Sequence, residues 1–109
     1  MTRDQITDRI LKENGRARRS KRRTGRMVRC VLATWPGVNM ALPSVRDEWK
    51  SRAVAKYQRE HREPKRNGRE GISPALLFFL AEIIIKLILL WWQNRDVTTA
   101  DLTRMYLQA

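Results

Sequence analysis

Residues 75–92 read ALLFFLAEIIIKLILLWW, and this stretch decides which folds the chain can adopt. Sixteen of these 18 residues are apolar, and the two exceptions are Glu82 and Lys86. A helix that is apolar almost all round is buried, either in protein or in lipid. The sequence therefore predicts a helix that needs a large partner surface.

The flanking residues indicate where this helix begins and ends. Ser73-Pro74 has the pattern of an N-cap followed by proline at the first helical position, so we expect the helix over about residues 74–93. The segment 71–92 is about 33 Å long as a helix, close to the ~30 Å hydrocarbon core of a bilayer. Trp91 and Trp92 stand at its polar border, where aromatic residues also gather at membrane interfaces.

Three polar residues of this segment fall on one side of the helix and form a polar seam. At about 100° per residue, Glu82, Lys86 and Gln93 lie within about 40° of one another. On an insertion scale the two charges cost roughly 5–7 kcal/mol, which nearly cancels the roughly 4–7 kcal/mol returned by the Leu, Ile and Phe residues. A polar seam in an apolar helix usually faces other helices, so we expect association along it.

Two environments for the apolar helix remain open, namely a bilayer and the core of an oligomer or larger assembly. A monomer of 109 residues cannot supply enough apolar surface to cover the helix on all sides, so a soluble monomer is the least favoured alternative. In either environment we expect the contacts to come from Leu76, Phe79, Leu80, Ile84, Leu87, Ile88, Trp91 and Trp92.

Net charge divides the chain into unlike parts. The chain carries 23 Lys and Arg against 11 Asp and Glu, a formal charge of +12. Residues 1–30 contribute +8, residues 31–70 contribute +4 and residues 71–109 contribute zero. We therefore expect a basic arm with a short helix, then a small basic helical region with a linker, then the apolar anchor helix with a C-terminal helix. The asymmetry indicates one part that faces a polyanion and one that faces an apolar partner.

The basic arm is densest over residues 16–29, which hold seven Arg and one Lys. Arginine binds phosphate through paired guanidinium contacts and counterion release, so nucleic acid is favoured over anionic lipid as the partner, without base specificity. Self-repulsion predicts either disorder or a helix that forms on binding. The predicted phosphate contacts are Arg16, Arg18, Arg19, Lys21, Arg22, Arg23, Arg26 and Arg29.

Weaker patterns complete an all-α fold, which we expect to be an extended helical chain. Residues 3–13 predict a short amphipathic helix, and residues 44–63 predict the clearest soluble helix, with Ser44 as candidate N-cap. A short C-terminal helix follows Thr98, which opens a capping-box pattern. The apolar run at 27–35 fits either a helix or a strand.

Catalytic and metal chemistry have little support in the sequence. The chain has one cysteine, Cys30, and one histidine, His61, too few for a zinc site of ordinary ligand count. Glycine-rich nucleotide-binding motifs and Cys-x-x-Cys are absent from the sequence. We expect no enzyme, no cofactor and no metal, with His61 a solvated side chain and Cys30 a buried or merely incidental thiol.

Together these features predict a non-enzymatic structural or interaction protein. It would link nucleic acid, bound by residues 1–70, to a membrane or multi-subunit assembly through helix 75–92. A minor component of a virus particle, such as a phage with an internal membrane, fits this role. A holin-like pore or lysis protein and a soluble oligomeric DNA-binding protein are the alternatives. The N-terminal residues do not predict a secretory signal, and the charge asymmetry predicts residues 1–70 on the cytoplasmic or interior side of any membrane.

Overall fold

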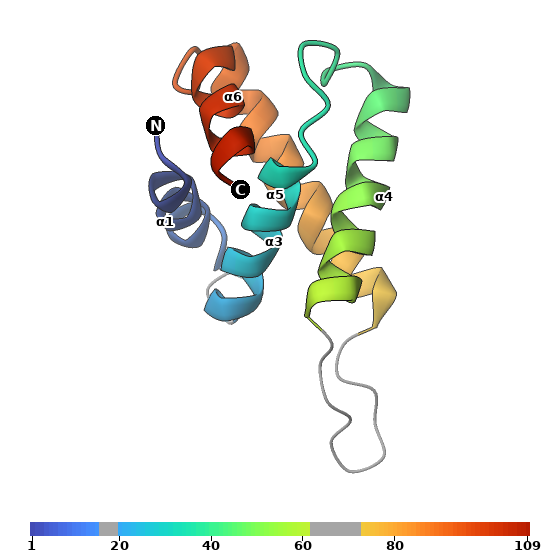
Figure 1. The fold of residues 1–109 in the computed structure, drawn as a ribbon. Helices are drawn as coiled ribbons and strands as arrows, with labels where there is room; N and C mark the ends of the chain where they lie inside the picture. The colour runs from blue at the N-terminus through green and yellow to red at the C-terminus, as the bar shows by residue number, and fades with distance from the viewer. Residues whose placement is uncertain (16–19, 62–72) are drawn as a thin grey trace, which may run out of the picture.

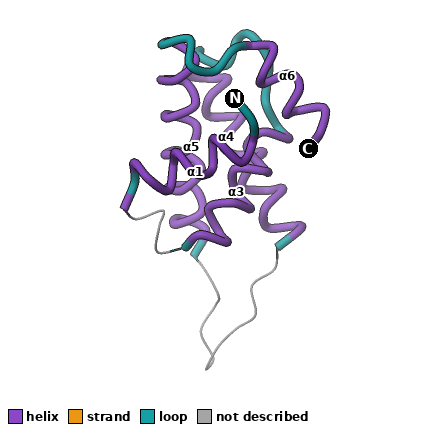
Figure 2. The backbone as a smooth tube through the Cα atoms, turned by 90° about the vertical axis from the view of Figure 1, so that its left-hand side faces the viewer, coloured by secondary structure: helices purple, strands orange, loops and turns teal. Residues whose placement is uncertain are grey.

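The computed structural model describes residues 1–15, 20–61 and 73–109, and every regular element in these ranges is a helix. The prediction of an all-α fold is thereby confirmed. Figures 1 and 2 show helices packed side by side, with the two chain ends close together beside the last helix. The helices are α1 (Arg3–Glu13), α3 (Lys21–Ala33), α4 (Pro43–Glu60), α5 (Pro74–Gln93) and α6 (Thr99–Gln108).

One hydrophobic core is shared by all five helices. Helix α3 packs against each of the other four, and α4 and α5 pack against each other. The largest fully buried side chains include Trp49, Tyr57 and Trp91. The radius of gyration is 13.6 Å, close to the value of about 13 Å for a compact domain of this length, so the packing is tighter than the extended arrangement expected.

Side-chain caps explain why three helices begin where they do. The Thr2 hydroxyl accepts from the Gln5 backbone N–H, and the Gln5 side chain accepts in return from Thr2, which forms a capping box at α1. Ser73 caps α5 by accepting from the backbone N–H of Leu76, as predicted. The predicted capping box at Thr98 also forms and starts α6. These caps satisfy N–H groups that a helix leaves unpaired at its N-terminus.

The predicted helix over 44–63 exists as α4, but both of its ends differ. It begins one residue earlier, at Pro43, with Leu42 as N-cap and no side-chain cap, so the expectation for Ser44 was wrong. Proline at the first helical position already has the helical φ and needs no N–H partner. The helix ends at Glu60, and residues 62 and 63 lie outside the described ranges.

The expectations for the basic arm change most. Residues 21–29, predicted to be disordered or to fold on binding, belong to α3. The apolar run at 27–35 is helical as far as Ala33, where α3 ends. Thr24, Met27 and Val28 are fully buried, so core packing holds this segment helical despite its charge. The boundary expected at residue 30 therefore falls inside a helix. Residues 16–19 lie outside the described part of the chain.

Candidate functional site

An arginine stripe runs along the outside of α3. Arg22, Arg26 and Arg29 are exposed and spaced four and three residues apart, so they share one helix face over about 10 Å. Lys21, in the first turn of the same helix, is also exposed. Arg23 is half-buried, and the predicted contacts Arg16, Arg18 and Arg19 lie outside the described ranges. We call Arg22, Arg26 and Arg29 the α3 arginine stripe.

The stripe residues have no carboxylate partner in the described part of the chain, whereas two basic residues of α4 are paired. On α4, Arg52 lies 2.6 Å from Glu48 and Lys56 lies 2.6 Å from Glu60. Across residues 1–15, 20–61 and 73–109, no carboxylate lies within ion-pair distance of a stripe guanidinium. Three positive charges therefore face solvent uncompensated, in positions from which guanidinium groups can bind phosphate.

Helix α5 has one buried face and one partly exposed face. By length and composition it could cross a membrane, with mean hydropathy 2.3, yet 39% of its most apolar window is buried inside the chain. The outward side has apolar residues spaced alternately four and three apart, which is the spacing of a coiled-coil seam. This α5 outer face consists of Leu76, Leu80, Ile83, Leu87 and Leu90, and Phe79 flanks it.

The eight residues predicted to contact lipid or subunits divide between the two faces of α5. Ile84, Ile88 and Trp91 are buried in the chain's own core, so they are not available to a partner. Leu80, Leu87 and Trp92 are half-buried. Leu76 and Phe79 are 57% and 42% exposed. The sequence could not distinguish the two faces, because both are apolar.

The polar seam lies at the edge of α5 that faces α4. The Glu82 carboxylate is 3.6 Å from the Lys86 ammonium and 4.0 Å from that of Lys50 on α4. Gln93 is exposed at the last turn. Glu82 therefore pairs with a helix of the same chain, and association with a partner along the seam stays a prediction. Both ion pairs are partly exposed, and such pairs stabilise a fold by at most about 1 kcal/mol.

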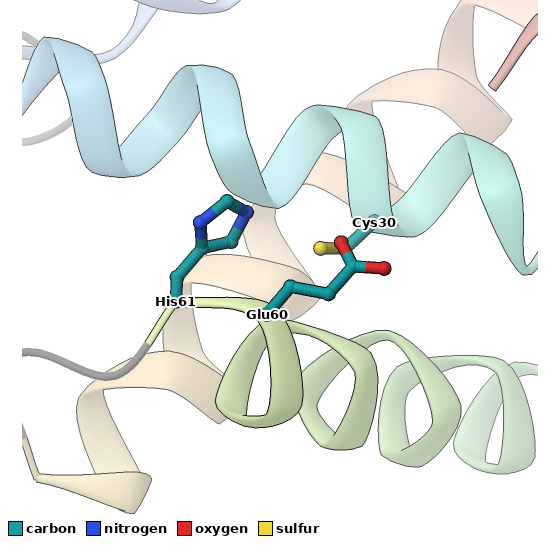
Figure 3. Close-up of side chains that lie close together, drawn as sticks. All are labelled: Cys30, Glu60 and His61. Carbon is teal, nitrogen blue, oxygen red and sulfur yellow. The ribbon is translucent and has the colours of Figure 1, made fainter.

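The structure also brings together three residues that the sequence did not associate. Cys30 of α3, Glu60 at the end of α4 and His61 at its C-cap each offer one ligand atom, and these atoms lie within 4.8 Å of one another. Figure 3 shows the Cys30 sulfur directed from α3 toward the space between the His61 ring and the Glu60 carboxylate. Thirty residues separate Cys30 from Glu60, so only the packing of α3 on α4 creates this cluster.

The cluster combines a buried thiol, a half-buried imidazole and an exposed carboxylate. Desolvation, with a contribution from the nearby Glu60 charge, raises the pKa of Cys30 to about 11. The Lys56 ammonium donates to Glu60 and lowers the pKa of that carboxyl. The Nε2 atom of His61 is buried and has no hydrogen-bond partner within the described chain, so the expectation of a solvated His61 was wrong.

Comparisons with protein-family models, with curated proteins and with solved structures find no match to this chain.

Proposed function

We propose that this protein is a non-enzymatic linker that binds a phosphate-rich polymer through the α3 arginine stripe and joins a multi-subunit assembly through the α5 outer face. The observation that carries the proposal is that one packed core holds both surfaces, and that neither is satisfied within the described chain. A linker needs two such surfaces held in a fixed relation.

Nucleic acid is the polymer that fits the stripe best. Arginine pairs with phosphate oxygens in a bidentate manner, and the whole chain carries a charge of +12 that attracts a polyanion. The stripe offers no feature that reads base edges, so binding is expected to be independent of sequence.

A second copy of the chain, or a related subunit, is the occupant that fits the α5 outer face best. The opposite face of α5 is held against α3 and α4, so a spanning α5 would leave core residues such as Trp49 and Tyr57 uncovered. Self-association leaves the core covered, because the alternating spacing lets the α5 outer face of one copy pack on the same face of another.

Insertion in a membrane is the second candidate for α5. Its 20 residues and mean hydropathy of 2.3 favour this candidate, as do the large apolar side chains left exposed at its N-terminal end. Either environment suits a minor structural component of a virus particle that joins genome to shell or bilayer.

Salt titration of duplex binding tests the polymer surface. We expect the triple variant Arg22→Gln, Arg26→Gln and Arg29→Gln to bind more weakly on all sequences and to lose about 2–3 units from the slope of log K against log salt. The control carries Arg46→Gln, Arg52→Gln and Arg59→Gln on α4, which removes the same charge from another helix. Equal losses in both triple variants would contradict the role of the stripe.

Sedimentation without detergent tests the apolar surface. We expect wild type to form oligomers and the variant Leu76→Lys with Leu90→Lys to be monomeric, because charges on the α5 outer face would lose their hydration on association. The control is Val38→Lys with Leu107→Lys, which changes two other exposed apolar residues, 69% and 77% exposed. The membrane candidate would be favoured instead if wild type were monodisperse only in detergent and the α5 variant were monodisperse without it.

A further inference from the structure

We propose that Cys30, Glu60 and His61 bind a zinc ion, with the Cys30 sulfur, one Glu60 carboxylate oxygen and a His61 ring nitrogen as ligands. The inference does not depend on the proposed function, because the cluster lies at the junction of α3 and α4 and includes neither a stripe residue nor a residue of the α5 outer face.

The three donor types match the chemistry of zinc. Zn²⁺ takes thiolate sulfur, imidazole nitrogen and carboxylate oxygen, and a tetrahedral site with bonds of ~2.0–2.3 Å places its ligand atoms about 3.5 Å apart. The ligand atoms here lie within 4.8 Å of one another, so a contraction of about 1 Å completes the site. Glu60 is exposed and His61 ends its helix, so both side chains can make this adjustment with little change in the core.

The unsatisfied imidazole nitrogen is an independent indication of a ligand. His61 Nε2 is buried without a hydrogen-bond partner in the described chain, and leaving a buried polar atom unpaired destabilises a fold. The ring also packs 5.1 Å from that of Tyr57, which restricts its orientation. A metal ion bound at this nitrogen would remove the desolvation cost and use the orientation that packing already imposes.

The positive charges around the cluster limit its affinity for zinc. Arg29, Lys56 and Arg59 lie near enough to act on the Cys30 thiol, and Lys56 also occupies one oxygen of Glu60 at 2.6 Å. Zinc must displace the thiol proton, after which thiolate and carboxylate together neutralise its two charges. We therefore expect weaker binding than at a closed four-ligand structural site, and affinity that rises with pH.

The same residue types could be imagined as a nucleophile with its base, but the environment of Cys30 opposes that role. A nucleophilic cysteine needs a lowered pKa, whereas burial holds this thiol protonated at neutral pH.

A tetrahedral zinc site also needs a fourth ligand. Because Glu60 is exposed, water can reach the metal and take the fourth position.

Titration of the untagged, full-length protein with Co²⁺ under reducing conditions tests the site, because cobalt in a tetrahedral site with a thiolate ligand absorbs intensely. We expect a one-to-one end point, loss of the absorption on adding Zn²⁺, and a higher Tm with Zn²⁺. His61→Asn and Cys30→Ala should each lower the affinity at least about tenfold. His61→Asn changes a residue outside the core, so the test does not depend on whether Cys30→Ala folds.

A matched pair of glutamates separates ligation from loss of surface charge. Glu60→Gln should weaken cobalt binding, whereas Glu48→Gln should not, although both residues pair with a basic residue four positions away at 2.6 Å. Absence of the charge-transfer absorption in wild type, or an unchanged cobalt affinity in His61→Asn, would overturn the proposal. Equal binding by Glu60→Gln and wild type would overturn the carboxylate as a ligand.

Discussion

Trp49 of α4 donates its indole N–H to the backbone carbonyl oxygen of Val31 in α3, at a distance of 2.8 Å within the core. This carbonyl belongs to the last turn of α3, where it also accepts from the backbone N–H and the hydroxyl of Thr34, each at 3.3 Å. The shorter contact from Trp49 comes from another helix, so it ties α4 to the C-terminal end of α3. This junction sets how α3, which carries the arginine stripe and Cys30, lies against α4, which carries Glu60.

Trp49→Phe should lower the free energy of unfolding by about 2–3 kcal/mol, since it removes a buried hydrogen bond and leaves a cavity. The matched variant Trp35→Phe should cost less than about 1 kcal/mol, because Trp35 is half-buried and its N–H meets only the Met40 sulfur, a weak acceptor. Urea unfolding of both variants checks the difference. Equal costs would contradict the role of the contact with Val31.

The C-terminus of α5 predicts a stabilising substitution. Arg95 has φ of 63°, and the N–H of Asp96 donates to the Trp91 carbonyl at 2.8 Å, which is the hydrogen bond of a Schellman motif. A residue other than glycine is strained there, so Arg95→Gly should raise the free energy of unfolding by about 0.5–1 kcal/mol. Gly37→Ala is the reverse control, because Gly37 has φ of 94° with open space around its Cα. It should destabilise the fold.

Asp101 gives the stability of α6 a pH dependence of known sign. The backbone N–H of Thr98, and then the Met1 amino group 3.2 Å away, lower the pKa of its carboxyl. Because the folded pKa is lower than the unfolded value of about 3.9, its contribution is present above that pH and is lost as the pH falls through the folded pKa.

Asp101→Asn keeps an acceptor at the cap and removes the charge. We expect it to destabilise the protein by about 0.5 kcal/mol at pH 7 and to match wild type in strong acid. Thermal melts from pH 7 to pH 2 follow the convergence. A difference between variant and wild type that does not change with pH would contradict the charge effect.

Local patterns predicted those parts of the fold that depend on neighbouring residues. Ser73-Pro74 and the capping box at Thr98 fix helix starts through contacts three residues apart, and both were found where the sequence put them. For residues 21–29 the sequence left open disorder or a helix formed on binding, because arginines dominate the composition of this segment. The signal was nevertheless present, since Thr24, Val28 and Val31 recur at helical spacing beneath the charges.

The candidate sites show the limit of that reasoning. The sequence identified α5 as apolar all round, but which face the core covers depends on how α3 and α4 pack against it. The Cys30 cluster depends on the packing of α3 on α4, because Cys30 lies 30 positions before Glu60 in the sequence. One cysteine and one histidine in the sequence argued against a metal site. A count of these two residue types does not reveal that the fold brings the Glu60 carboxylate next to them.

The polar seam of α5 gives a final prediction that separates the two environments proposed for this helix. Glu82→Leu with Lys86→Leu removes two partly exposed ion pairs, so the free energy of unfolding should change by less than about 1 kcal/mol. It also removes both charges from the apolar helix, which favours insertion in lipid by roughly 5–7 kcal/mol on the insertion scale. Partition into lipid vesicles should therefore rise well beyond any change in stability.

The control is Glu48→Leu with Arg52→Leu, an ion pair of the same spacing on α4. It adds the same apolar area to a helix that carries many other charges, so it should not drive insertion. If the seam contributes to subunit contacts, only the α5 variant should also alter the oligomeric state measured by sedimentation. An unchanged oligomer with raised partition would place the seam outside the interface and leave the α5 outer face as the contact surface.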